Sequence, residues 1–106
     1  MKSDLKTIIL AYKQKLETLG IPVDKIILFG SRAKHTARPD SDIDLCIVSK
    51  TFGKDYHHEM VQLLKVAHEL SLDQVIEPHP YHPHDLTDQY DSLATEIKTY
   101  GITVTD

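Results

Sequence analysis

The chain has 106 residues, of which 41% are hydrophobic and 26% charged, and 12 basic against 16 acidic side chains give a net charge of −4. This length and composition predict one soluble domain over residues 1–106. Proteins that hold long nucleic acids usually carry a basic excess, so direct nucleic-acid binding is not expected. Apolar runs too short for a membrane span or a signal peptide, together with the single cysteine Cys46, predict a cytoplasmic protein without an internal disulfide.

The first half of the chain predicts one helix and one buried strand. Between residues 5 and 19, apolar side chains recur at helical spacing. The apolar run over residues 25–29 stops at Gly30, which is typical of a buried strand. Residues 31–36 are expected to form a short helix, and residues 37–41 a turn.

A second strand is predicted over residues 42–48, where the sequence alternates. Ile43, Leu45 and Ile47 share one face, because successive side chains of a strand point to opposite sides. Asp42 and Asp44 lie on the other face. The strand is therefore expected to be half-buried, with two carboxylates at the start of its open face.

The second half of the chain predicts two helices and two short strands. Residues 60–70 and residues 86–97 show helical spacing of apolar side chains. Residues 73–77 form a strand candidate that Pro78 ends, and residues 101–104 form a terminal strand candidate. Helices that alternate with strands indicate an α/β or α+β fold, with helices packed mainly on one face of the sheet.

The chemistry of the chain is indicated by Asp42 and Asp44. Two like charges side by side repel one another unless cations neutralise them. Magnesium favours carboxylate oxygens combined with substrate phosphates. Two such ions, roughly 4 Å apart, stabilise both the attacking and the leaving oxygen of an in-line displacement. The pair therefore predicts a metal site that acts on a polyphosphate.

A phosphate site is predicted just upstream, where the first strand ends. Gly30 has no side chain, so its backbone can approach a ligand closely. Ser31 opens the expected helix, whose N–H groups attract phosphate, although Ser31 can equally serve as a plain N-cap. Arg32, Lys34 and Arg38 are candidates to offset the phosphate charge, and Arg32 is the one we select.

Gly30-Ser31, ten intervening residues and then Asp42-Ile43-Asp44 resemble the Gly-Ser-x10-Asp-x-Asp signature of the DNA polymerase β-like nucleotidyltransferase superfamily. The string GSRAKHTARPDSDIDLCIV is similar to the minimal nucleotidyltransferase (MNT) subgroup. The resemblance implies that superfamily's fold, a small mixed sheet. It also implies that Gly30 and Ser31 hold the phosphates of a nucleoside triphosphate, and that Asp42 and Asp44 bind two Mg²⁺ ions.

The resemblance further implies a third carboxylate on a neighbouring strand, which completes one metal site and helps to deprotonate the acceptor. Glu77 is the predicted residue, and Asp73, with the same parity on that strand, is the alternative. His79, His82 and His84 alternate with prolines downstream. No cysteine pair accompanies them, so we expect an extended polar loop near the mouth of the site and not a zinc site.

Small MNT proteins are commonly paired with HEPN-domain ribonuclease toxins as their antitoxins, and some adenylylate a toxin tyrosine. The resemblance thus implies transfer of AMP from ATP to a hydroxyl of a HEPN partner. Two alternatives remain open at this stage. The chain can be a non-catalytic module that masks its partner stoichiometrically, or a transferase that acts on RNA 3′ ends or on a small molecule.

Overall fold

A four-stranded sheet organises the chain, with its strands in the order β3-β2-β1-β4. β1 pairs antiparallel with both β2 and β4, whereas β2 and β3 are parallel, so the sheet is mixed. The computed structural model describes residues 3–34 and 42–105. The strands are β1 (Lys25–Phe29), β2 (Ile43–Val48), β3 (Ile76–Tyr81) and β4 (Ile102–Thr105).

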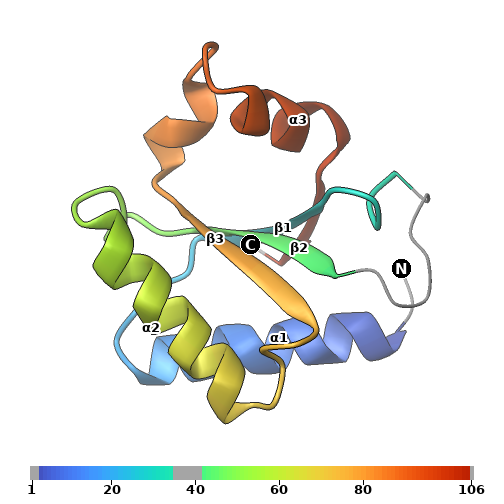
Figure 1. Ribbon diagram of the computed structural model, residues 1–106, viewed down its shortest axis with the longest axis vertical. Helices are drawn as coiled ribbons and strands as arrows, with labels where there is room; N and C mark the ends of the chain where they lie inside the picture. The colour runs from blue at the N-terminus through green and yellow to red at the C-terminus, as the bar shows by residue number, and fades with distance from the viewer. Residues whose placement is uncertain (1–2, 35–41, 106) are drawn as a thin grey trace.

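Helices pack on both faces of this sheet. α1 (Ser3–Thr18) and α2 (Tyr56–Glu69) cover one face, and the 3₁₀ helix η1 (Pro83–Thr87) and α3 (Ser92–Tyr100) lie on the other, as Figure 1 shows. The two longer helices share one face, in line with the prediction that helices cover mainly one face, and only the shorter η1 and α3 lie on the other. No helix in the described ranges has the length and apolar character needed to cross a membrane.

Strand alternation divides the buried side chains into two clusters. The even-numbered strand residues Ile26 and Leu28 pack with α1 and α2, as do the odd-numbered Leu45 and Ile47 of β2. On the opposite face, Cys46 and other strand side chains pack beneath η1 and α3. That face of β2 is therefore less open than expected, because only its N-terminal end, at Asp44, stays partly exposed.

The prediction that Pro78 ends the third strand is wrong. β3 runs from Ile76 through both Pro78 and Pro80, and it lies at an edge of the sheet. Ile43 N–H donates to Val75 O, and Ser49 N–H donates to Tyr81 O, so the odd-numbered positions of β3 form the ladder with β2. The prolines occupy even-numbered positions whose N–H would point to the open edge, where its absence breaks no ladder hydrogen bond.

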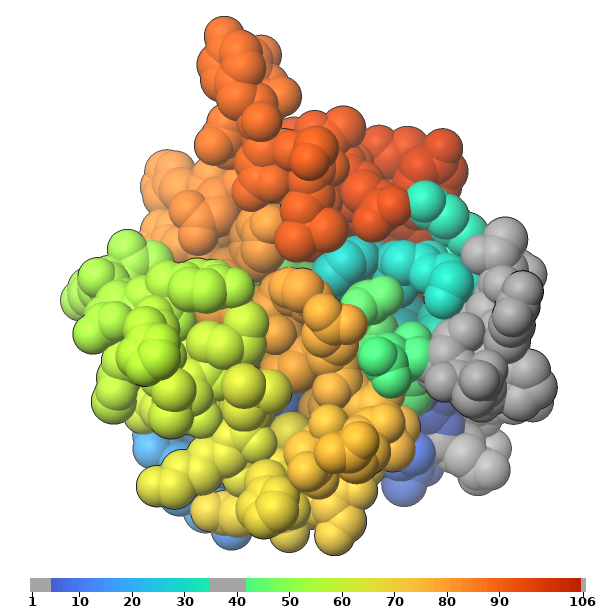
Figure 2. Space-filling view, viewed as in Figure 1, coloured from blue at the N-terminus to red at the C-terminus, as the bar shows by residue number. Residues whose placement is uncertain are grey.

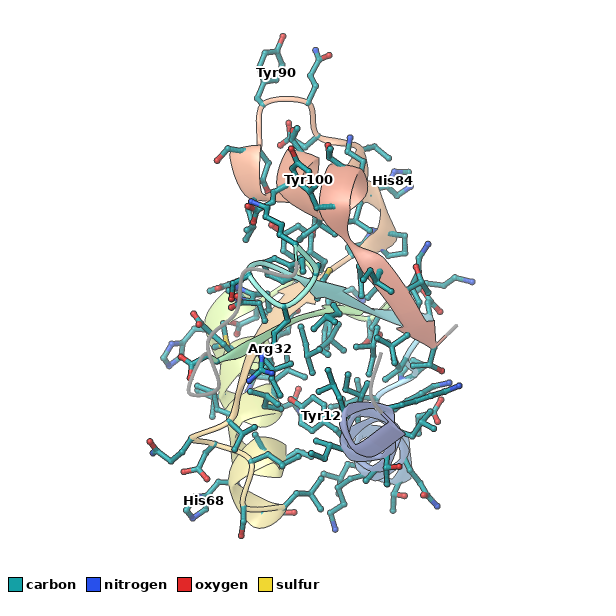
Figure 3. All side chains as sticks on the ribbon, turned by 90° about the vertical axis from the view of Figure 1, so that its right-hand side faces the viewer. Tyr12, Arg32, His68, His84, Tyr90 and Tyr100 are labelled. Atoms are coloured by element: carbon teal, nitrogen blue, oxygen red, sulfur yellow. The ribbon has the colours of Figure 1, made fainter. Side chains whose placement is uncertain are left out.

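The single helix predicted over residues 86–97 is also wrong. Leu86 belongs to η1, a turn follows, and α3 begins only at Ser92. The Asp91 side chain starts α3 by accepting hydrogen bonds from the backbone N–H groups of Leu93 and Ala94. Tyr90, expected on the helix, is 88% exposed at the projecting turn seen in Figures 2 and 3. The N-cap at Asp91, and not the spacing of apolar residues, therefore determines where α3 begins.

One buried carboxylate holds the loop that enters α2. Glu59 is 6% exposed and accepts hydrogen bonds from the backbone N–H groups of Gly53, Lys54 and Asp55 at 3.0–3.1 Å. Burial alone would raise the pKa of Glu59, but the three donors together lower it. The ionised side chain therefore stabilises the folded state.

We expect the Glu59→Gln variant to lose about 2 kcal/mol of unfolding free energy at pH 7, because a neutral amide binds these donors less strongly. The folded-state pKa lies below the ordinary value of 4.5, so the contribution is present above that pH and is lost as the pH falls further. Urea unfolding at pH 7 and pH 4 measures it. Glu69→Gln, on the exposed end of α2, serves as the control and should change stability little.

Candidate active site

Asp44 and Glu77 lie side by side at the N-terminal ends of two parallel strands. They are register partners in the β2–β3 pairing, and both side chains lie on the face that α3 leaves partly open. The Asp44 side chain is 25% exposed and the Glu77 side chain 57% exposed. The start of β2 (green) and the start of β3 (yellow-orange) meet at the surface in Figure 2. This edge of the sheet is accessible to a ligand.

Asp73, the alternative third carboxylate, lies elsewhere. It belongs to the loop between α2 and β3, and its Oδ2 is 3.3 Å from His68 Nδ1. The side-chain contact to His68 is the first cause of a lowered Asp73 pKa. Of the two candidates, the structure brings only Glu77 to Asp44.

The end of β1 places Gly30 directly against Asp44. Phe29 is the register partner of Asp44, and Gly30 follows with a φ of +75°. A Cβ atom at position 30 would overlap the Asp44 carboxylate. Only glycine tolerates both the positive φ and this close approach. The turn after β1 and the carboxylate of β2 are therefore adjacent, and their joint action on a nucleotide stays a prediction.

The residues after Gly30 form a hydrogen-bonded turn over positions 31–34, with Lys34 N–H donating to Gly30 O. Ser31 and Arg32 are partly buried in this turn, and Figure 3 shows Arg32. Their predicted contacts with a nucleotide stay predictions. Positions 35 and 36 of the expected helix, Arg38 and the turn predicted over 37–41 lie outside the described residues.

Lys34 connects this turn to α3. Its Nζ lies 2.7 Å from Glu96 Oε1 and 4.8 Å from the centre of the Tyr100 ring. The hydrogen bond to Glu96 is the first cause of a raised Lys34 pKa. Since this ammonium group is already paired with a carboxylate, Lys34 is a weaker candidate for a phosphate contact than sequence alone suggests.

The electrostatics of Asp44 favour a cation. Burial, followed by the charges of Glu77, Asp42 and Glu96 and a side-chain hydrogen bond with Glu77, raises the Asp44 pKa to about 6. Each charged group in that set is another carboxylate. Asp42 itself is exposed and lies just before β2 begins. A divalent cation bound here would reduce the electrostatic repulsion between Asp44 and the neighbouring carboxylates.

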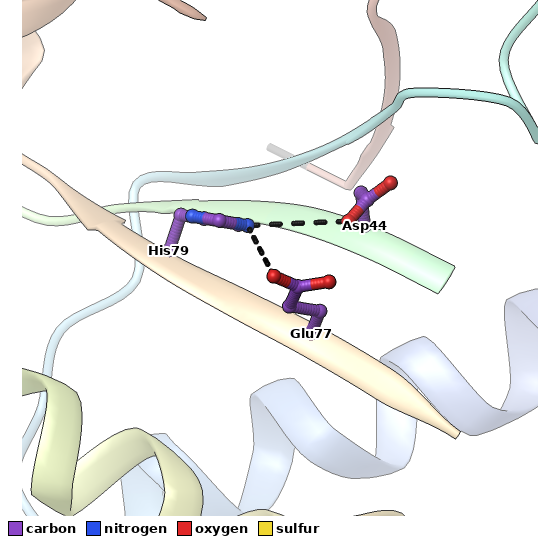
Figure 4. Close-up of side chains that lie close together, drawn as sticks. All are labelled: Asp44, Glu77 and His79. Carbon is purple, nitrogen blue, oxygen red and sulfur yellow. Dashed lines mark ion pairs between the residues drawn. The ribbon is translucent and has the colours of Figure 1, made fainter. Parts of the chain in front are cut away.

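His79 is the site residue that sequence reasoning missed. It lies two positions after Glu77 on the same face of β3, and its Nε2 is 4.0 Å from Asp44 Oδ1 and 3.9 Å from Glu77 Oε1, as Figure 4 shows. Burial lowers the His79 pKa, which the Glu77 charge only partly offsets. The period of two that aligned the carboxylates would have found His79, had Pro78 not been read as the end of the strand.

Together, these side chains fit a divalent cation. One ligand atom from each of Asp44, Glu77 and His79 lies within 4.8 Å of the others. His79 Nε2 is buried and makes no hydrogen bond. A bound cation would satisfy this nitrogen as well as both carboxylates. His82 and His84, in contrast, stack on each other at a ring distance of 5.3 Å around the start of η1.

We expect Mg²⁺ binding to weaken as the pH falls below about 6, because a proton on Asp44 then competes with the cation. For one competing proton, the dissociation constant should rise roughly tenfold per pH unit. Calorimetric titration with MgCl₂ at pH 7.5 and pH 5 would measure the change. An affinity that stays constant over this range would contradict the assignment of Asp44 as a ligand.

Comparison with known proteins shows the fold and the family of the chain. A solved structure described as "Crystal structure of the toxin-antitoxin with AMP-PNP" shares the fold, with a TM-score of 0.60 and 24% identity over 97% of this chain and 73% of that one. No curated protein gave a significant match. Residues 5–97 match the nucleotidyltransferase domain family. Since the match includes the Gly30 turn, both strands of the site and most of α3, the chain belongs to the nucleotidyltransferase domain family.

Proposed function

We propose that the chain is an MNT antitoxin that transfers AMP from ATP to a hydroxyl of a HEPN ribonuclease toxin and thereby neutralises it. The observation that carries the proposal is the alignment of Asp44 with Glu77 beside the Gly30 turn, where a side chain at position 30 would strike the carboxylate. Family membership supports the reaction class. A structure of this fold is a toxin–antitoxin with AMP-PNP, which supports both the nucleotide and the type of partner.

In the proposed reaction, Asp42, Asp44 and Glu77 would hold two Mg²⁺ ions, which would supply charge neutralisation at the phosphates and a more acidic acceptor hydroxyl. The Gly30 turn admits the triphosphate close to the strand ends. The acceptor oxygen forms a bond to the α-phosphorus as the bond to the β-phosphate oxygen breaks. Pyrophosphate leaves with the bonding electrons, and the exposed Glu77 carboxylate accepts the hydroxyl proton and passes it to water.

The test is incubation of the chain with a candidate HEPN protein, Mg²⁺ and ATP labelled at the α-phosphate. Label on a tyrosine of the partner supports the proposal, whereas label on RNA or on a small molecule supports a different acceptor. The Asp42→Asn, Asp44→Asn double variant should transfer no label. If that variant protects cells from the toxin as well as the native chain does, neutralisation works by masking and the proposal is wrong.

A further inference from the structure

We propose that His79 is a direct nitrogen ligand of the cation at Asp44 and Glu77, and that it makes this site prefer transition-metal ions such as Co²⁺ and Mn²⁺ over Mg²⁺. The inference shares the metal site with the proposed function but does not depend on the transfer reaction. It concerns a residue outside the Gly-Ser and Asp-x-Asp positions of the motif.

His79 lies on the same face of β3 as Glu77. Glu77 and His79 are two residues apart on one strand, so both side chains lie on the face that also presents Asp44. The imidazole extends back along the strand toward the two carboxylates, as Figure 4 shows. Its Nε2 is almost equidistant from them, at 4.0 Å from Asp44 Oδ1 and 3.9 Å from Glu77 Oε1.

These separations are too long for hydrogen bonds but suit a cation between the groups. Metal ions hold nitrogen and carboxylate ligands at about 2.0–2.2 Å, so two ligands of one ion lie roughly 3–4 Å apart. Small side-chain rotations of the 57%-exposed Glu77 would close the remaining gap. His79 Nε2 is thus near both carboxylates without a hydrogen bond to either one.

The surroundings of His79 fix its ring in this position. The side chain is 19% exposed, and Nε2 itself is buried and has no hydrogen-bond partner. A buried polar atom without a partner destabilises the fold, and coordination of a cation would remove that cost. The Phe29 ring contacts the imidazole edge to face, with the ring centres 5.2 Å apart. Pro78 and Pro80 restrict the backbone on either side.

The chemistry of the ligand set gives the metal preference. Mg²⁺ takes oxygen ligands almost exclusively and gains little from an imidazole. First-row transition ions bind imidazole nitrogen well, and their affinity rises from Mn²⁺ to Co²⁺. A site of two carboxylates and one imidazole should therefore bind Co²⁺ more tightly than Mn²⁺, and Mn²⁺ more tightly than Mg²⁺.

Coordination of a metal ion by the His79 imidazole can be detected directly in the native chain. After chelator treatment, the protein is loaded with Mn²⁺ and studied by pulsed EPR, which reports a coupling between the metal and a coordinated imidazole nitrogen. We expect this coupling in the native protein and in His57→Gln, a control at an exposed histidine of α2, and we expect its loss in His79→Gln. A native Mn²⁺ complex without nitrogen coupling overturns the inference.

The preference is measured by calorimetric titration of the same three proteins with CoCl₂ and MgCl₂. We expect His79→Gln to weaken Co²⁺ binding roughly tenfold or more and to leave Mg²⁺ binding within about twofold, since Mg²⁺ relies on the carboxylates. An unchanged ratio of Co²⁺ to Mg²⁺ affinity refutes the proposal. A chain that binds Co²⁺ through His79 but modifies no partner contradicts the proposed function alone.

Discussion

The Asp44→Asn variant should lose roughly 10³-fold of its transferase activity while its metal-free fold becomes more stable. The loss of activity follows from the removal of a charged metal ligand, since a bound cation contributes several kcal/mol of transition-state stabilisation. The gain in stability follows from the environment of Asp44. Burial and the neighbouring carboxylates raise the Asp44 pKa from 3.8 to about 6, so ionisation at neutral pH costs free energy in the folded state.

The sign of this effect can be checked against pH. Because the folded-state pKa is raised, Asp44 destabilises the native chain as the pH rises from about 4 to about 6, and the full cost is present above 6. An asparagine has no charge to bury, and its amide can donate a hydrogen bond to Glu77. Allowing for solvent screening, we expect a gain of about 1–2 kcal/mol at pH 7.5 that shrinks toward zero at pH 4.

Urea unfolding in the presence of a chelator, combined with the labelled-ATP assay, measures both effects on one variant. Asp73→Asn is the matched control, because Asp73 lies in the loop before β3 and pairs with His68 outside the site. It should retain the transferase activity. An Asp44→Asn protein that is inactive because it unfolds, or active at the native rate, would be incompatible with the assignment of Asp44.

The Gly30→Ala variant should lose roughly 10²-fold of the activity, since displacement of a reacting group by about 1 Å costs that much. The added Cβ overlaps the Asp44 carboxylate, which must move away. A positive φ also strains any residue other than glycine, by about 1–2 kcal/mol. The two effects have to be separated, because strain alone would only destabilise the fold.

The Gly20→Ala variant separates the strain of a positive φ from the contact with Asp44. The φ of Gly20 is +87°, and a Cβ there would meet nothing within 4 Å. Gly20→Ala should therefore show the strain of a positive φ, about 1–2 kcal/mol in urea unfolding, with unchanged activity. The excess loss of stability in Gly30→Ala, together with its lost activity, measures the close contact with Asp44. If both variants keep full activity, Gly30 is not part of the site.

Much of the fold follows from periodicity in the sequence. The alternation over residues 42–48 correctly placed Ile43, Leu45 and Ile47 on one face of the strand, and the structure shows that this face packs against α1 and α2. The apolar run that stops at Gly30 correctly marked the end of β1, because a buried strand shows itself in consecutive apolar side chains. Alternation and apolar runs depend only on neighbouring residues, so they can be recognised in a single sequence.

The errors came from contacts that are distant in sequence or from competing local chemistry. The sequence predicts a strand end at Pro78, but at an open edge the proline breaks no ladder hydrogen bond. With the strand ending there, His79 is not predicted to lie beside the two carboxylates. The apolar spacing also predicts Tyr90 on a helix, whereas the Asp91 cap starts α3 after it. The spacing of apolar residues says nothing about which strand lies at an edge.

The position of Pro78 and Pro80 also limits how other chains can associate with the protein. An exposed sheet edge ordinarily offers a row of N–H groups to which a further strand can add, either from a partner or in aggregation. At β3 the two prolines remove N–H groups from that row beside Glu77 and His79, which disfavours the addition of a further strand there. In the described sheet the opposite edge is β4, and strand addition at that edge would leave Glu77 and His79 uncovered.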